Sequence, residues 1–189
     1  MSSSAEQLYQ GKLNLRAEKG EDKRLFIDLD ICSSKQCKEC VVECSYFYHR
    51  QYPGNNGIRS VIELATYALV CRRCEEPHCV NSCPVEALEQ QGNGKDKILI
   101  RHNMRCISCK SCSHACPYGT IYPENVPLLV HNCDFCLDRR NEKNEPLCIK
   151  SCPYNALSLK KANIELDENT FLVGDNIIVH STHWDRDKV

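Results

Sequence analysis

The sixteen cysteines of this chain fall into four groups of four, and no cysteine is left over. Three residues separate the last two cysteines of every group, and Pro84, Pro117 and Pro153 follow the last cysteine of groups two, three and four. Ser45 takes that place in group one. Such an internal repeat predicts four copies of one ligand-binding loop. The groups are Cys32, Cys37, Cys40 and Cys44; Cys71, Cys74, Cys79 and Cys83; Cys106, Cys109, Cys112 and Cys116; and Cys133, Cys136, Cys148 and Cys152.

The third group has the spacing C-x2-C-x2-C-x3-C-P, which is the run found in bacterial ferredoxins. In such a run, three closely spaced thiolates bind three irons of one 4Fe-4S cube, and the fourth thiolate reaches the other cube of a pair. The proline has a fixed φ and no N–H donor, so the chain leaves the fourth ligand in a defined direction. We therefore predict 4Fe-4S clusters, and the repeat extends this prediction to all four groups.

Zinc, disulfides and catalytic thiols are the alternatives for so many cysteines. Zinc sites made of four thiolates usually come from two C-x2-C pairs far apart, and groups two and four could be divided in that way. The closely spaced triplet of group three suits a single tetrahedral ion poorly. A disulfide framework needs export, and residues 1–23 contain neither an apolar signal core nor a twin arginine before one. With every cysteine in a group, none is left as a nucleophile.

Composition excludes several other classes. The formal net charge of −1 argues against a partner made of nucleic acid. No apolar run approaches the roughly 18 residues that cross a bilayer, so we expect no direct membrane insertion. The chain has no G-x-G-x-x-G fingerprint for a flavin or nicotinamide, and no carboxylate pair or triad stands out. We therefore predict electron transfer without catalysis, in the cytoplasm or exported together with a partner that carries the signal.

The pattern between the groups predicts short strands and turns. Residues 24–30, 97–102 and 127–131 are expected strands, and residues 60–70 are expected to form a strand, with a short helix as the alternative. Residues 92–95 carry a hairpin turn signal. A strand pair is expected around Gly174 and Asp175, and short helical turns are expected after the Cys-Pro steps. The charged run at residues 139–146 is expected to be a surface loop.

Residues 37–88 carry the closest resemblance to a known family. With the four motifs, they resemble the four-cluster ferredoxin-like iron–sulfur subunits of molybdenum and tungsten oxidoreductases, CO dehydrogenases and hydrogenases. The likeness is greatest to the small subunits of tungsten enzymes of the aldehyde:ferredoxin oxidoreductase type. It covers about residues 24–160. The chain departs from the usual pattern in the C-x4-C step from Cys32 to Cys37, which puts normal ligation by Cys32 in doubt, and in His78 after Pro77.

The resemblance implies an α+β fold of two pseudo-symmetric bacterial-ferredoxin-like modules, in which short antiparallel strands and short helices surround pairs of clusters. It also implies how the ligands are shared. A sequential arrangement, with group one paired with two and group three with four, is not excluded by the spacing. The implied sets are Cys32, Cys37, Cys40 and Cys152; Cys133, Cys136, Cys148 and Cys44; Cys71, Cys74, Cys79 and Cys116; and Cys106, Cys109, Cys112 and Cys83.

The expected domains are an N-terminal tail over residues 1–23, a four-cluster domain of two intertwined modules over 24–160, and a C-terminal docking extension over 161–189. The resemblance implies a large catalytic metalloenzyme subunit, with a tungsten or molybdenum cofactor, as one partner. A flavin subunit, a ferredoxin or a quinone module is the expected second partner. A free-standing polyferredoxin shuttle is the alternative function, and a zinc-binding interaction module is a third.

Overall fold

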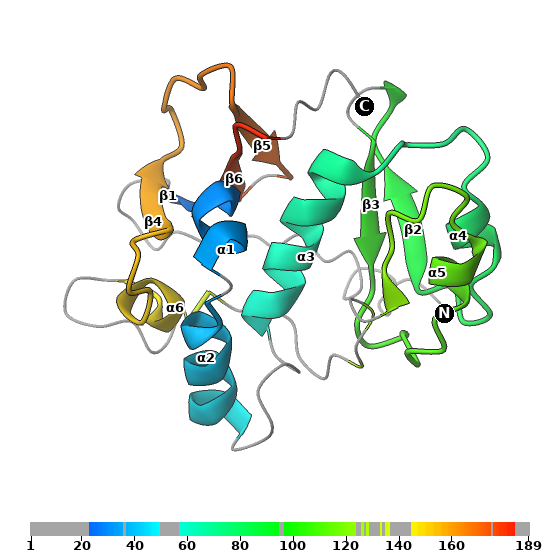
Figure 1. Cartoon of the computed structure of the whole chain (residues 1–189), viewed down its shortest axis with the longest axis horizontal. Coiled ribbons are helices and arrows are strands. Elements are labelled where there is room, and N and C mark those ends of the chain that lie inside the picture. The colour runs from blue at the N-terminus through cyan, green and yellow to red at the C-terminus, as the bar shows by residue number, and fades with distance from the viewer. Residues whose placement is uncertain are drawn as a thin grey trace, which may run out of the picture.

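The computed structural model describes residues 23–35, 37–49, 57–94, 97–123, 126, 128, 133, 135–136, 145–174 and 176–183, with only the backbone of residues 45–49. These residues form small sheets and short helices, which confirms the predicted α+β class (Figure 1). No helix of the described part of the chain is long and apolar enough to cross a membrane. Much of the predicted strand at 127–131 and of the predicted loop at 139–146 lies outside the described residues.

The larger sheet has the strand order β4-β1-β6-β5. Strand β1 (Lys23–Asp28) pairs antiparallel with β4 (Leu157–Lys161) and parallel with β6 (Ile177–His180). Strand β5 (Thr170–Val173) pairs antiparallel with the other edge of β6. The predicted strand at 24–30 is therefore confirmed, although the chain turns into a helix at Leu29. The sheet thus joins the two ends of the described chain.

The smaller sheet is the antiparallel hairpin of β2 (Leu88–Gln91) and β3 (Ile98–Arg101). Gly92 and Gly94 in the turn have positive φ angles of 90° and 54°, which glycine adopts at no steric cost. The predicted strand at 97–102 and the predicted hairpin turn are both confirmed.

Strand pairing follows the cysteine repeat in a regular way. Strand β1, which precedes group one, pairs with β4, which follows group four. Strand β3, which precedes group three, pairs with β2, which follows group two. The outer two groups therefore share one antiparallel pair and the inner two groups share another. We call the part of the structure built around β1 and β4 the outer module, and the part built around β2 and β3 the inner module.

Helix α3 (Gly57–Val70) replaces the strand that we predicted over residues 60–70, so that prediction was wrong. Its buried residues Ile58, Val61, Ala65 and Ala68 recur every three or four positions, which is the period of a helix. The β-branched and aromatic content of the segment favoured a strand, but the burial of residues at this helical period decided the outcome. Figure 1 shows α3 lying between the larger sheet and the β2–β3 hairpin.

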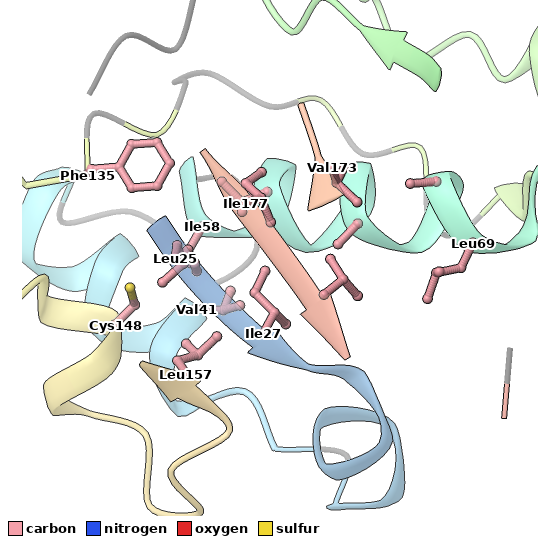
Figure 2. Packing of buried hydrophobic residues seen from close by; sticks show 14 residues of the cluster. Leu25, Ile27, Val41, Ile58, Leu69, Phe135, Cys148, Leu157, Val173 and Ile177 are labelled. Carbon is pink, nitrogen blue, oxygen red and sulfur yellow. The ribbon is translucent and has the colours of Figure 1, made fainter. Parts of the chain in front are cut away.

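Two separate cores hold these elements together. In the outer module, Leu25 and Ile27 on β1 are buried against Ile58 of α3 and Ile177 of β6 (Figure 2). In the inner module, a smaller core holds Tyr67, also from α3, with Leu88 and Leu99 of the hairpin and with several cysteines. Because α3 supplies side chains to both cores, it fixes one module against the other.

The remaining helices are short and carry cysteines. They are α1 (Leu29–Lys35), α2 (Glu39–His49), α4 (His78–Asn81), α5 (Ser111–Ala115) and α6 (Leu147–Lys150). In groups two, three and four, the third cysteine lies in a helix that ends before the fourth cysteine. A single turn follows each Cys-Pro step, closed by a hydrogen bond from the N–H three residues later to the carbonyl of the fourth cysteine, so the predicted turns are present as single turns. Proline cannot continue a helix. In group one Ser45 replaces it, and α2 runs on through Cys44 to His49.

The predicted strand pair around Gly174 is formed by β5 and β6. These strands lie in the segment that we expected to be a C-terminal extension, and Ile177, Ile178 and Val179 are at most 2% exposed. The segment after β6 is held to α1 by Asp30. The carboxylate of Asp30 accepts hydrogen bonds from Ser181 Oγ at 2.7 Å and from the backbone N–H and Oγ1 of Thr182 at 2.6 Å each.

Candidate metal centres

All sixteen predicted ligands lie in the described part of the chain, and none forms a disulfide. Cys71, Cys112, Cys136 and Cys148 are buried, and Cys109 is the exposed member of the sixteen. The outer core contains or contacts cysteines of groups one and four, whereas the inner core contains or contacts cysteines of groups two and three. The fold therefore brings group one together with group four in the outer module, and group two together with group three in the inner module.

We call each set of neighbouring thiols a gathering. The first gathering contains cysteines of group one and the last cysteine of group four. Burial, followed by the charges of Cys32, Cys152 and Cys37, raises the pKa of the Cys40 thiol to about 12. Burial, followed by the charge of Cys152 and then those of Asp28 and Cys37, raises the pKa of Cys32 to about 11. Cys32 therefore takes its place beside these thiols despite the longer loop before Cys37.

The second gathering joins group four to the end of group one. Cys148 lies in α6, which packs against α2, the helix that carries Cys44. Burial, followed by the charges of Cys133 and Cys136 and then those of Cys40 and Cys44, raises the pKa of Cys148 well above its ordinary value. The influence of Cys40 shows that the two gatherings of the outer module adjoin each other.

The third gathering joins group two to the end of group three. Cys71 follows α3 directly, Cys79 lies in α4 and Cys116 follows α5. Burial, followed by the charges of Cys71 and Cys116, raises the pKa of Cys79 to about 11. Burial also raises the pKa of Cys71; the Arg73 backbone N–H opposes this shift, and the charges of Cys74 and Cys116 add to it.

The fourth gathering joins group three to the end of group two. Burial raises the pKa of Cys112; the Ser113 backbone N–H opposes the shift, and the charges of Cys106, Cys83 and Cys109 add to it. Cys109 is different because it is exposed and its sulfur lies 3.4 Å from Ser111 Oγ. Hydrogen bonds from the side chain and backbone of Ser111 lower its pKa.

The loops around the first two cysteines of groups two, three and four share a backbone feature. The residue just before the second cysteine is in the left-handed region, with φ of 53° at Arg73, 57° at Ser108 and 54° at Phe135. For residues other than glycine this conformation costs about 1–2 kcal/mol each. It turns successive N–H groups toward one side, which makes a concave site for an anion such as a sulfide or thiolate.

A second left-handed turn follows the last cysteine of the same three groups. The third residue after that cysteine has φ of 49° at Glu86, 62° at Gly119 and 51° at Asn155. In group two the turn directs the N–H of Ala87 to Cys83 Sγ at 3.2 Å. In group three it brings Thr120 Oγ1 to 3.3 Å from Cys116 Sγ. Although burial opposes it, hydrogen bonding by Thr120 and by neighbouring N–H groups lowers the pKa of Cys116.

Only part of this pattern was visible in the sequence. Gly119 and Asn155 are residue types that tolerate the left-handed region, whereas Glu86, Arg73, Ser108 and Phe135 carry no such signal. An alignment of the repeat copies shows that these positions correspond, but only the backbone shows their conformation.

The four gatherings suit a cluster larger than one ion. Across the residues that the structure describes, no three histidine, cysteine, aspartate or glutamate side chains are close enough together to hold a single metal ion. The thiols of each gathering are nevertheless near enough for their charges to interact. A 4Fe-4S cube takes one thiolate on each of four irons, so its ligands are spread around the cube. The N–H groups that the left-handed turns orient can donate hydrogen bonds to the sulfurs of a cluster.

Comparison with known proteins gives the class. Residues 62–162, which are more than half of the chain, match the family described as the 4Fe-4S dicluster domain. The chain belongs to this family, and it is a non-catalytic electron-transfer protein that carries four 4Fe-4S clusters. The predictions of the cofactor and of a chain without catalytic activity are confirmed.

Three of the relatives are components of reductases or dehydrogenases. The B component of the anaerobic dimethyl sulfoxide reductase of Escherichia coli (strain K12) is 31% identical over 148 residues, covering 70% of this protein and 70% of the relative. The B component of the tetrathionate reductase of Salmonella typhimurium is 29% identical over 142 residues, which are 68% of this protein and 53% of the relative. The B component of the sulfite dehydrogenase of Allochromatium vinosum is 29% identical over 162 residues, covering 70% of this protein and 65% of the relative.

Proposed function

We propose that this chain is the iron–sulfur subunit of a molybdenum or tungsten oxidoreductase and relays single electrons between a catalytic subunit and a second carrier. The observation that carries the proposal is the gathering of sixteen thiols into four sets, two in each module. Similarity to the B components of dimethyl sulfoxide reductase and of tetrathionate reductase supports a molybdenum enzyme. The resemblance of residues 37–88 to tungsten-enzyme subunits makes tungsten the second candidate.

When bound, a 4Fe-4S cluster accepts and releases one electron at a time. The residues of this chain hold the clusters and control their surroundings. The cysteine thiolates would bind iron, and the N–H groups of Ala87 and Arg73 would donate to sulfur. The two apolar cores shield the sulfurs from water, and exclusion of water is one of the means by which a protein sets a reduction potential.

We also propose the ligand sets that the family resemblance implies. Cys32, Cys37 and Cys40 would share a cluster with Cys152, and the other three sets would follow the same interleaved rule. A pair of double variants separates this arrangement from the sequential one. Cys32→Ser with Cys152→Ser should alter one cluster in the electron paramagnetic resonance (EPR) spectrum, because both ligands serve the same cube. Cys148→Ser with Cys152→Ser should alter two. Two altered clusters in the first variant would reject the interleaved assignment.

The partner is tested by purifying the native complex through a tag on this chain and measuring its metals. We expect about 16 iron and about 16 acid-labile sulfide per chain, with a large subunit in fixed ratio that contains molybdenum. Tungsten in place of molybdenum would favour the enzymes of the aldehyde:ferredoxin oxidoreductase type. Absence of a fixed partner would support the free polyferredoxin shuttle. About four zinc per chain without sulfide would reject electron transfer altogether.

The second partner and the compartment belong to the same proposal. A flavin subunit, a ferredoxin or a quinone module would exchange electrons at the other end of the relay, and the complex would work in the cytoplasm unless its partner is exported. The segment from residue 181 onward would dock a partner, because Asp30 holds its start against α1, the helix that carries Cys32. Removal of residues 184–189 should then lower the yield of the complex without changing the iron content of the free chain.

A further inference from the structure

A buried ion pair connects α3 to the inner hairpin. Arg101, at the end of β3, donates from Nε to Oε1 of Glu63 at 2.7 Å, and its Nη2 makes a second bond to Oε2 of the same carboxylate. The side chains of Arg101 and Glu63 are only 3% and 10% exposed. Burying two charges is expensive, and apolar side chains of similar volume often stabilise a fold as well or better. Stability alone is therefore a weak reason for this pair.

The pair lies in the inner module, close to the core that holds its cysteines. Arg101 pairs with Leu88 across the hairpin, and Leu88 packs in the same buried core as Cys112 and Cys106. The charges of Arg101 and Cys106, which begins group three five residues later in the chain, are near enough to interact. Glu63, Tyr67 and Cys71 follow one another at intervals of four residues, so they share one face of α3 and its end. Tyr67 packs in the same buried core as Cys112 and Cys106. The guanidinium is thus a buried positive charge next to the core that holds cysteines of group three.

The Tyr67 hydroxyl adds to this polar environment. It is buried, and among the described residues it has no hydrogen-bond partner of normal geometry. Burial, followed by the charge of Glu63, raises the pKa of Tyr67, while the charge of Arg101 opposes the shift. The tyrosine therefore remains neutral, and the guanidinium is the positive group of this network.

We propose that Arg101 raises the reduction potential of the cluster bound by Cys106, Cys109, Cys112 and Cys83, and that Glu63 positions the guanidinium and partly offsets its charge. This inference rests on the proposed function and on the proposed ligand set. Reduction takes the cluster core from 2+ to 1+ by adding one electron from the neighbouring carrier. Arg101 keeps its proton throughout, so no proton is exchanged. A fixed positive charge close to a cluster stabilises the more negative, reduced state.

The two partners should have opposite effects on the potential. Arg101→Gln removes the positive charge and keeps a polar side chain, so the equilibrium constant for reduction of this cluster should fall about tenfold, which is about 59 mV for one electron. Glu63→Gln removes the offsetting negative charge, so the same constant should rise. In an EPR-monitored redox titration of the purified chain, one of four steps should move and the other three should stay.

Controls separate charge from structure. Arg24→Gln removes the same charge from β1 in the outer module, where Arg24 Nη1 donates to the Ala162 carbonyl at 3.0 Å, and it should leave the inner steps unchanged. Arg101→Lys should restore part of the shift because it restores the charge without the two-pronged geometry. If Arg101→Gln loses iron, the shift measured in Glu63→Gln alone decides between the two roles, since that variant keeps the arginine and its charge.

The outcomes are distinct. Shifts of opposite sign, at full iron content and confined to one step, support the proposal. Shifts of the same sign in both variants, or unchanged steps at full iron content, overturn it and assign the pair a structural role. Wild-type protein without about 16 iron per chain would overturn the proposed function itself, so the two failures are told apart before any variant is made.

Discussion

Replacing Asp30 with asparagine should loosen the chain after β6 while leaving the rest of the fold in place. Asp30 accepts three hydrogen bonds from Ser181 and Thr182, which follow β6 directly. Asparagine has nearly the same shape, but it carries no charge and has only one acceptor oxygen. Its NH2 group would face the Thr182 N–H, so two donors would meet where a donor and an acceptor now pair.

The size of the effect follows from the number and burial of these bonds. A hydrogen bond to a charged group contributes about 1.5–3 kcal/mol. The Asp30 side chain is 20% exposed, and a rotated hydroxyl can still bond to the asparagine, so we expect the loss of about one such bond. His183 is 75% exposed, and its ion pair adds little. A loss of about 2 kcal/mol makes local opening about 30-fold more frequent.

Amide hydrogen exchange of the cluster-loaded protein measures this opening. The amides of Ser181 and Thr182 should exchange about 30-fold faster in the Asp30→Asn variant, and the paired amides of β2 and β3 should keep their rates. Glu165→Gln is the matched control, because it removes one negative charge from the exposed loop between β4 and β5. Wild-type exchange at Ser181 and Thr182 in the Asp30→Asn variant would refute the assigned role of the carboxylate.

Three further predictions concern the clusters and the core. Cys109→Ala should lower the iron content from about 16 to about 12 per chain and leave a poorly folded protein, because cluster binding supplies folding free energy; native stability with unchanged iron would contradict this. Ile27→Ala, at a site with 0% exposure, should cost about 2–5 kcal/mol, measured as an earlier denaturant midpoint for loss of the visible cluster absorbance, whereas an unchanged midpoint would contradict the contribution of this buried side chain to stability. Asn155→Val should cost about 1–2 kcal/mol in the same assay because of the left-handed backbone, and Asn155→Gly should be neutral or stabilising; equal effects of the two substitutions would remove backbone strain as the cause.

The cysteine spacing predicted the cofactor because ligand geometry is local. Group three alone identifies a ferredoxin-like loop, and the three Cys-Pro steps extend it along the chain. The strands at β1, β3, β5 and β6 were also predicted, because alternating apolar residues between turns are a local signal. Residues 60–70 misled us because Val61, Ile62 and Tyr67 favour a strand, whereas the packing of α3 against both cores decided for a helix.

Long-range pairing and backbone strain could not be predicted. The parallel pairing of β1 with β6 brings Leu25 beside Ile177, and no local sequence signal near either residue predicts this pairing. The bond between Glu63 and Arg101 likewise joins residues 38 positions apart. At Arg73 and Phe135 the left-handed conformation is imposed by the loop around them, since neither side chain favours it.

The strand order has a consequence for how the protein is made. The elements of the inner module, from Cys71 to Val126, leave the ribosome as one continuous stretch. Strand β1 precedes the other strands of the described residues, yet both of its neighbours, β4 and β6, lie beyond residue 156. The strand pair that brings group one to group four therefore cannot form until residues 157–161 have been synthesised. The strand pair of the inner module can therefore form before that of the outer module.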